Sequence, residues 1–176
     1  MTTIVLDATT LISLGTIGEL DLLTVFDGEL VIPSTVREEV TTEPARTNLD
    51  RFVDAQDIQT LDSDSHNRIP QAQSVLDEEG VNGDVMLIAA VLAHTATNRP
   101  IGVVSDDRRV RTTARGLGAT VTGTVGVVVR AVDDGHDPDA AHDLIRRLDA
   151  HGLHMTGSLR EKAASLIDAA ADDRET

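Results

Sequence analysis

The chain has 176 residues, 40% of them hydrophobic, so it can bury one substantial core and its length does not call for a second domain. It contains no cysteine, which excludes disulfides, a thiolate zinc site and a thiol nucleophile. No apolar stretch approaches the length of a membrane span, and the first residues lack a basic region followed by an apolar one. We therefore expect a soluble, cytoplasmic protein with a single domain over 1–176.

The charge balance is strongly acidic, because 30 Asp and Glu residues stand against 15 Lys and Arg residues and give a net charge of -15. Lys162 is the only lysine, so arginine supplies the other basic residues. This composition resembles that of halophilic cytoplasmic proteins, which work in molar salt. The Debye length there is about 3 Å, so the negative charge does not exclude nucleic acid as a partner.

Short apolar runs, each followed within a few residues by a helical pattern, predict buried parallel strands and an α/β fold. In chain order, the expected strands are 3–6, 30–32, 101–104 and 119–122. Two short helices are expected within 11–23, another begins at Thr35, and longer ones are expected at 83–96, 108–117, 124–133, 138–150 and 158–170.

Residues 41–80 have the least regular pattern of the chain. They carry polar and acidic runs, Pro44 and Pro70, and one potential strand near Ile58. We expect an irregular or helical excursion over the sheet edge there. At the other end of the chain, residues 172–176 are expected to be frayed.

Four acidic residues are candidates for one shared pocket: Asp7, Glu39, Asp84 and Asp107. Asp7 and Asp107 each follow a predicted strand, and ligands of open α/β sheets bind outside the carboxyl ends of the strands. Ionised carboxylates about 4 Å apart repel by roughly 4 kcal/mol at an effective dielectric near 20, so a cluster requires cations or protons. The pattern indicates a site for a hard divalent ion. For either Asp alone, the alternative is an N-cap on the following helix, which stabilises by about 1 kcal/mol.

Glu39 lies in the helix that is expected to begin at Thr35. Thr35 and Glu38 fit a capping box, which assigns Glu38 a structural role. Glu39 then lies between Val36 and Val40, on the face expected to turn toward the sheet. An acid on that face needs a partner, and the alternative is an arginine-paired or partly exposed glutamate.

Asp84 opens an apolar helical pattern, and its spacing to Ile88 and Val91 directs it toward the packed face. An Asp in the first turn also interacts favourably with the helix dipole, which stabilises a helix by about 0.3–1 kcal/mol. This interaction would explain an Asp at position 84 but would not require its side chain to face the protein interior. The joint arrangement of the four acids is what favours the site.

Arg108, Arg111 and Arg115 share one helical face just after Asp107. Cations are disfavoured in the first turn of a helix, so a negative partner is expected nearby, either phosphate or the acid cluster. The alternative is a solvated face. Phe26 and Phe52 are the only aromatic residues, so base stacking cannot be the main mode of binding nucleic acid.

At these residues the sequence resembles the PIN-domain ribonucleases, and more narrowly the VapC-like proteins related to the toxins of toxin-antitoxin pairs. The resemblance runs through most of the chain. The segments that carry it are IVLDATTLISL (4–14), VIPSTVREEV (31–40), GDVMLIAA (83–90), VSDDRR (104–109) and LGATVTGTVGVV (117–128).

The resemblance implies a three-layer α/β/α sandwich with a parallel sheet, and a Mg²⁺- or Mn²⁺-dependent ribonuclease. Its metal and catalytic residues would be Asp7, Glu39, Asp84 and Asp107, with Asp106 as an additional acid, Thr9 and Ser105 as supporting hydroxyls, and Arg108, Arg111 and Arg115 on the RNA phosphates. We further expect a homodimer and a toxin role with a partner antitoxin.

Two alternatives from other classes stay open. A catalytically silent PIN-like module could keep its acids while only binding RNA or protein. A receiver-like or dehalogenase-like phosphotransfer domain would need a lysine after a late strand or a second Asp at position 9, whereas Lys162 lies in the last predicted helix and Thr9 occupies that position.

Overall fold

The computed structural model describes residues 1–175 and contains a four-stranded parallel sheet in the order β2-β1-β3-β4. The strands are Thr3–Leu6 (β1), Glu29–Val31 (β2), Ile101–Val104 (β3) and Thr120–Thr122 (β4). In the register of the central pair, Leu6 lies beside Val104. The carboxyl ends of β1 and β3 therefore lie side by side at the same end of the sheet.

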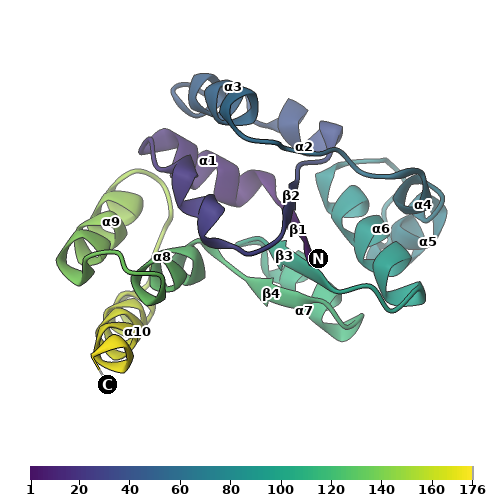
Figure 1. The fold of residues 1–176 in the computed structure, drawn as a ribbon. Coiled ribbons are helices and arrows are strands. Elements are labelled where there is room, and N and C mark those ends of the chain that lie inside the picture. Colours follow the sequence, from purple (N-terminus) through teal and green to yellow (C-terminus); the bar gives the residue numbers. More distant parts are fainter. Residues whose placement is uncertain (176) are drawn as a thin grey trace.

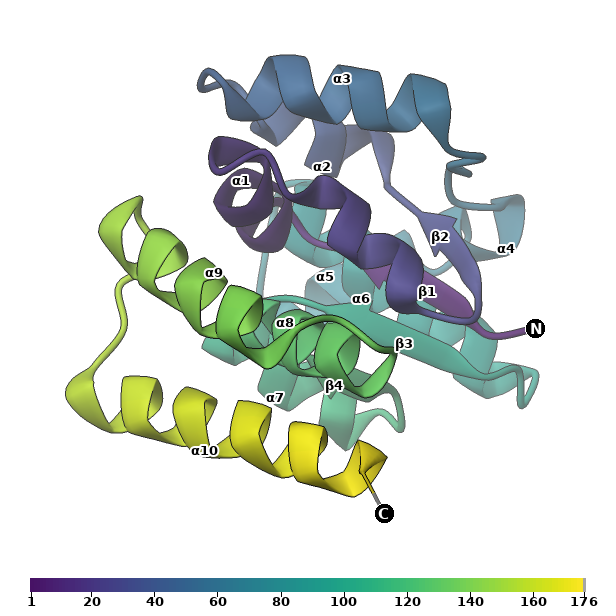
Figure 2. The same cartoon turned by 60° about the vertical axis from the view of Figure 1, so that its left-hand side comes forward.

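Helices cover both faces of the sheet, which gives three layers (Figures 1 and 2). Ile4 and Leu6 of β1 pack into one hydrophobic cluster, whereas Val5 packs into the other, as the two-residue period of a strand requires. Residues of the first cluster come from α1 (Ala8–Thr16), η1 (Leu20–Val25), α2 (Ser34–Glu39), α3 (Ala45–Ala55), α8 (Thr124–Asp133), α9 (Pro138–Ala150) and α10 (Gly157–Arg174). The second cluster contains residues of α5 (Ile69–Leu76), α6 (Gly83–Ala96) and α7 (Arg108–Gly116).

The predicted three-layer α/β fold with a parallel sheet is confirmed. β1 and β3 have the expected bounds because both are apolar and almost wholly buried, so the run of apolar residues coincides with the strand. α6, α8 and α9 also match the bounds expected from their apolar periodicity.

Residues 41–80 contain three helices, namely α3, the short α4 (Ser63–His66) and α5. Near Ile58 the chain forms only an isolated parallel bridge, in which Gln59 pairs with Val31 at the end of β2. The backbone N–H of Ile32 donates to the Gln59 carbonyl at 2.9 Å, which covers part of the β2 edge. α4 and α5 lie against α6, so this segment supports the helix that carries Asp84.

Two local predictions are wrong. Helix α2 begins at Ser34 because the Pro33 carbonyl already accepts a hydrogen bond from Arg37 N at 3.0 Å, so Thr35 lies inside the helix and forms no capping box. The expected fraying from residue 172 is also wrong, because α10 continues through Arg174, while Thr176 lies outside the described residues. Within residues 1–175, no helix combines the length and apolarity needed to cross a bilayer.

Candidate active site

Asp7 is the first residue after β1 and is buried, with only 2% of its surface exposed. It N-caps α1, because its Oδ1 accepts a hydrogen bond from Ala8 N at 2.7 Å. Its Oδ2 accepts hydrogen bonds from the hydroxyls of Thr9, at 3.0 Å, and Ser105. Three donors therefore hold one orientation of this carboxylate at the carboxyl end of the sheet.

Burial raises the pKa of the Asp7 carboxyl above its ordinary value, because the charged form loses hydration. The hydrogen bonds from Ser105 and Thr9 act in the opposite direction, since they stabilise the ionised form. The negative charge of Asp84 raises the pKa of Asp7 further. Asp84 is therefore close enough to Asp7 to oppose the ionisation of Asp7, although the two residues come from different strand-helix units.

The hydroxyls of Thr9 and Ser105 join the two strand ends. Besides donating to Asp7, Ser105 Oγ accepts from Asp107 N at 3.1 Å, and Thr9 Oγ1 accepts from Asp106 N at 3.1 Å. The loop after β3 is thus tied to the loop after β1 through both side chains. A change in either hydroxyl would disturb the Asp7 carboxylate and the neighbouring backbone together.

Asp106 and Asp107 are adjacent but have different contacts. Asp107 N-caps α7, because its Oδ1 accepts a hydrogen bond from Val110 N at 2.9 Å. Both strand-end acids, Asp7 and Asp107, are therefore N-caps, as the alternative interpretation expected. Asp106 is directed to the start of α8, where its carboxylate accepts hydrogen bonds from Thr124 N, at 2.8 Å, and from the Thr124 hydroxyl. Asp106 therefore connects the loop after β3 to α8.

Glu39 reaches the start of α6, where its Oε1 accepts a hydrogen bond from Gly83 N at 2.7 Å. A side chain at Gly83 would collide with this carboxylate, because a Cβ there would lie 2.7 Å from Glu39 Oε2. The prediction that Glu39 lies on a buried helix face is wrong, since the residue is exposed. Helix α2 ends at Glu39, and Val40 is already extended, so the helical stripe does not continue past Val36.

Asp84 lies in the first turn of α6 and is paired with Arg109. Its Oδ2 accepts from Arg109 Nη2 at 3.1 Å, and the same nitrogen donates to Glu78 Oε1 at 2.7 Å. The hydrogen bonds to Glu78 and Asp84 raise the pKa of the Arg109 guanidinium above its ordinary value. The Asp84 carboxylate is only partly buried, with 26% of its side chain exposed.

The arginines of α7 have distinct surroundings. Arg111 Nη1 donates to the Ser105 carbonyl at 2.9 Å, so its guanidinium lies beside the loop that carries the acids. Arg108 and Arg115 are exposed, and within residues 1–175 neither makes an ion pair. Arg109 was not among the arginines expected to contact phosphate, but its pairing with Asp84 and Glu78 agrees with the expectation that a cation in a first turn has a negative partner nearby.

Asp7 therefore lies near Asp84, and Glu39 contacts Gly83, the residue before Asp84. Asp107 lies on the neighbouring loop, where its backbone N–H donates to Ser105. Within residues 1–175, no three acidic or histidine side chains are close enough together to form a group that could hold a metal ion. The donor set nevertheless suits a hard cation, because it consists of carboxylates and two of them repel each other. An arginine now supplies the positive charge beside Asp84.

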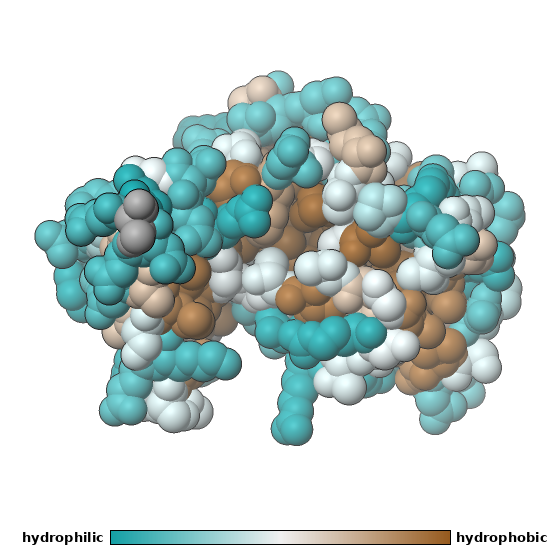
Figure 3. Space-filling view, turned by 60° about the horizontal axis from the view of Figure 1, so that its bottom comes forward, coloured by the Kyte–Doolittle hydropathy of each residue, from teal (hydrophilic) through white to brown (hydrophobic). Residues whose placement is uncertain are grey.

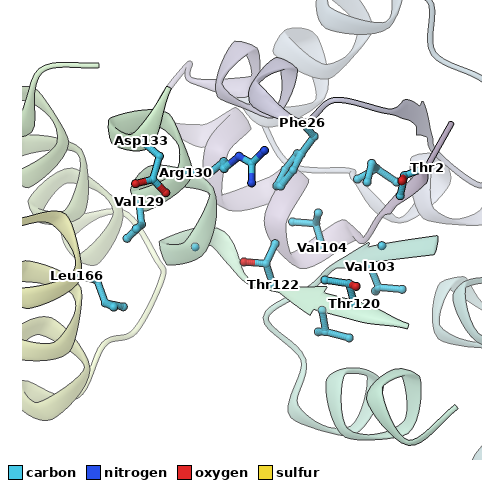
Figure 4. Close-up of a pocket in the computed structure, with 14 residues that line it drawn as sticks. Thr2, Phe26, Val103, Val104, Thr120, Thr122, Val129, Arg130, Asp133 and Leu166 are labelled. Carbon is cyan, nitrogen blue, oxygen red and sulfur yellow. The ribbon is translucent and has the colours of Figure 1, made fainter. Parts of the chain in front are cut away.

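A cavity of about 460 Å³ lies between β1, β3 and β4 on one side and α8 with α10 on the other (Figure 4). Phe26, Arg130 and Leu166 line it, together with residues of the three strands. None of the four predicted acids lines this cavity. The cavity is therefore separate from the place where the four acids lie.

A family model described as "PIN domain" covers residues 3–169, which is nearly the whole chain. No curated protein matches the sequence. The match agrees with the parallel sheet, and it excludes the receiver-like alternative. The chain therefore belongs to the PIN-domain family, whose members are generally nucleases.

Proposed function

We propose that this protein is a Mg²⁺- or Mn²⁺-dependent endoribonuclease that hydrolyses the phosphodiester bonds of RNA. The observation that best supports the proposal is the buried Asp7 carboxylate, held by two hydroxyls at the carboxyl edge of the sheet and opposed by the charge of Asp84. Such a carboxylate pair is costly for folding, which is typical of a functional site.

In this proposal Asp7, Glu39, Asp84 and Asp107 hold the divalent ion, with Asp106 as an additional acid. Oxygen donors are the ligands that Mg²⁺ and Mn²⁺ prefer. When bound, the ion would supply positive charge to activate a water for in-line attack and to stabilise charge developing on the phosphate and the leaving oxygen. Bringing the acids around one ion requires side-chain movement, because no group of three is assembled among residues 1–175.

The residues around the acids have supporting roles. Ser105 and Thr9 orient the Asp7 carboxylate through the hydrogen bonds that they already make. Arg108, Arg111 and Arg115 would contact RNA phosphates, since guanidinium groups match the geometry of phosphate oxygens. The products would carry a 5′-phosphate and a 3′-hydroxyl.

Cleavage of mixed RNAs in molar KCl with Mn²⁺ tests the proposal. We expect wild-type protein to cut and the chelated protein to be inactive. Asp84→Asn should reduce the rate by at least about a hundredfold, because it removes charge that holds the ion near the scissile phosphate. Equal cleavage by wild type, Asp84→Asn and Asp7→Asn would contradict the assignment. Analysis of product ends would check the predicted chemistry.

A second candidate is a catalytically silent PIN module that binds RNA or protein. The Arg109 ion pair favours it, because this arginine already neutralises Asp84 without a metal ion. Under this alternative, wild-type protein would not cleave RNA at any Mn²⁺ concentration, whether its partner is RNA or a protein. The same assay, followed with and without the chelator, distinguishes the two candidates.

The biological setting is also part of the proposal. We place the protein in the cytoplasm as a one-domain homodimer that acts as the toxin of a toxin-antitoxin pair. The expected result is growth arrest when wild-type protein is expressed alone, and normal growth with Asp7→Asn. Light scattering of purified protein in molar KCl would measure the oligomeric state.

Arg109→Gln is expected to increase Mn²⁺ affinity, because it frees the Asp84 carboxylate and removes a competing positive charge. An exposed ion pair contributes about 0.2–1 kcal/mol, so the dissociation constant should fall by about 1.4-fold to fivefold. Titration calorimetry with chelator-stripped protein measures this change. Arg108→Gln is the matched control, since it removes the same charge from the adjacent, exposed position. An equal change in both variants would show that only net charge matters.

A further inference from the structure

One segment of the chain differs sharply in charge from the remainder. Residues 108–132 contain no Asp or Glu, and their five basic residues are Arg108, Arg109, Arg111, Arg115 and Arg130. The rest of the chain has ten basic residues (15 less 5) and all 30 acidic ones, so it carries a charge of -20. The segment comprises α7, β4 and nearly all of α8, which lie next to the acids of the candidate site.

A groove of about 420 Å³ runs along this segment, and it begins at the candidate site. Asp106 and Arg111 line one part of it, and Leu153 and His154 of the loop between α9 and α10, with Lys162 of α10, line the other part. Lys162 is the only lysine in the chain, and it is exposed here. Arg111 also donates to the Ser105 carbonyl at 2.9 Å, so the groove and the acid-bearing loop share this side chain.

The acid in the groove is held at the start of α8. The Asp106 carboxylate accepts hydrogen bonds from both the backbone and the hydroxyl of Thr124. Gly123 adjoins it, and a Cβ at this position would lie 2.6 Å from Asp106 Oδ1 and would also collide with Arg111. Glycine at position 123 therefore leaves room for the guanidinium and the carboxylate at the mouth of the groove.

The remaining walls of the groove are apolar, and they continue into the neighbouring cavity. Both spaces are lined by Val121, Thr122, Gly126 and Leu166, so they form one depression over β4 and α8. Thr122 and Leu166 are visible on opposite sides of that cavity in Figure 4. Figure 3 shows apolar residues (brown) gathered in hollowed regions of this side of the molecule, with hydrophilic residues (teal) around them.

We infer that this groove binds a single-stranded stretch of the RNA next to the scissile phosphate, with Arg111 and Lys162 on backbone phosphates. The inference rests on the proposed function. Its specific support is charge complementarity, because Arg111 of the acid-free segment and the only lysine line the same groove beside the acids of an otherwise strongly acidic chain. Apolar walls suit ribose and base surfaces, and a single strand exposes its bases, whereas a duplex stacks and pairs them. The volume is in the range of small-ligand sites, about 300–1,000 Å³.

Lys162 gives a direct test, because an amine-reactive acetylating reagent has only two targets, Lys162 and the amine of the exposed Met1. The full chain is treated in chelator, with and without a short oligouridylate, and acetylation is followed by mass spectrometry. At an RNA concentration of ten times the dissociation constant, Lys162 should react about tenfold more slowly. The Met1 amine is the internal reference and should react at an unchanged rate.

Two variants provide an independent measurement of the same contacts. Fluorescence anisotropy of the labelled oligouridylate is recorded in chelator from about 0.1 M to about 1 M KCl. The salt slope is the change in the logarithm of the binding constant with the logarithm of the KCl concentration, and removing one phosphate contact should reduce its magnitude by about 0.7. The affinity of Lys162→Gln relative to wild type should therefore be about fivefold lower at about 0.1 M KCl than at about 1 M KCl. Arg111→Gln should have a similar effect. Arg146→Gln is the matched control, since it removes an exposed charge from α9 that is paired with Asp143 and does not line the groove.

The outcomes separate the groove from the nuclease activity. Protection of Lys162 with a reduced salt slope supports the groove, whether or not the wild-type protein cleaves RNA in Mn²⁺. Cleavage without protection, and with the same slope in Lys162→Gln as in Arg146→Gln, overturns the groove and leaves the nuclease proposal standing. Absence of RNA binding overturns the RNA assignment and leaves the apolar walls for a protein partner.

Discussion

Asp7→Asn is expected to abolish RNA cleavage while making the metal-free protein relatively more stable at neutral pH. The expected loss of activity is at least about a hundredfold, because the proposed site loses a charged ligand. The gain in relative stability follows from burial. The Asp7 carboxylate has 2% exposure and lies near Asp84, so its ionised form is disfavoured in the folded state. Asparagine keeps the shape and can still cap α1 through its oxygen.

The direction of the pH effect follows from the raised pKa of Asp7. Folded protein holds this proton more tightly than unfolded protein, whose ordinary value is 3.8. The stabilising contribution is therefore fully present below that value and is lost as pH rises through the higher pKa of the folded state. The free energy of unfolding of Asp7→Asn should consequently increase relative to that of wild type as the pH rises through this window.

Urea unfolding in chelator at a series of pH values measures this difference. Asp54→Asn is the matched control, because it makes the same chemical change at an exposed position outside the site. Mn²⁺ should then stabilise wild-type protein and leave Asp7→Asn little changed, since only wild type retains the proposed ligand. A variant that loses relative stability with rising pH would show that Asp7 is not strained by burial.

Ser105→Ala is expected to destabilise the protein and to impair the site at the same time. Ser105 is fully buried, donates to Asp7 and accepts from Asp107 N at 3.1 Å. Alanine leaves the Asp107 N–H without this acceptor and the Asp7 carboxylate with one donor fewer. Loss of buried hydrogen-bond partners of this kind costs about 1–3 kcal/mol in the free energy of unfolding.

The same substitution should move the acidic limb of the cleavage profile to higher pH. The Ser105 hydrogen bond lowers the pKa of Asp7, so its removal raises that pKa, and a higher pH is then needed to ionise the carboxylate. A cleavage-rate profile in Mn²⁺ and a urea titration measure the two effects. Ser74→Ala, at an exposed position on α5, is the control. An unshifted profile in an otherwise folded Ser105→Ala protein would contradict the role of Ser105 in holding Asp7 ionised.

Much of the fold could be predicted from local pattern. β1 and β3 are continuous apolar runs because parallel strands are buried on both faces, and α6 is recognisable from its length and apolar content. The position of Asp7 after β1 follows from the same pattern. The start of α2 was missed because Thr35 and Glu38 imitate a capping box, whereas the Pro33 carbonyl makes the first helical hydrogen bond.

Three features can be derived from the amino-acid sequence without the structure: the order of strands and helices along the chain, the acid-free segment, and the placement of two acids at strand ends. They depend only on neighbouring residues and on periodicity. Only the tertiary structure decided which distant groups meet. Arg109 pairs with Asp84 and Glu78, Asp106 is directed to Thr124, and Lys162 lies in the same groove as Arg111. These contacts join segments separated by many residues, and their geometry depends on how the helices pack on the sheet, which no local pattern specifies.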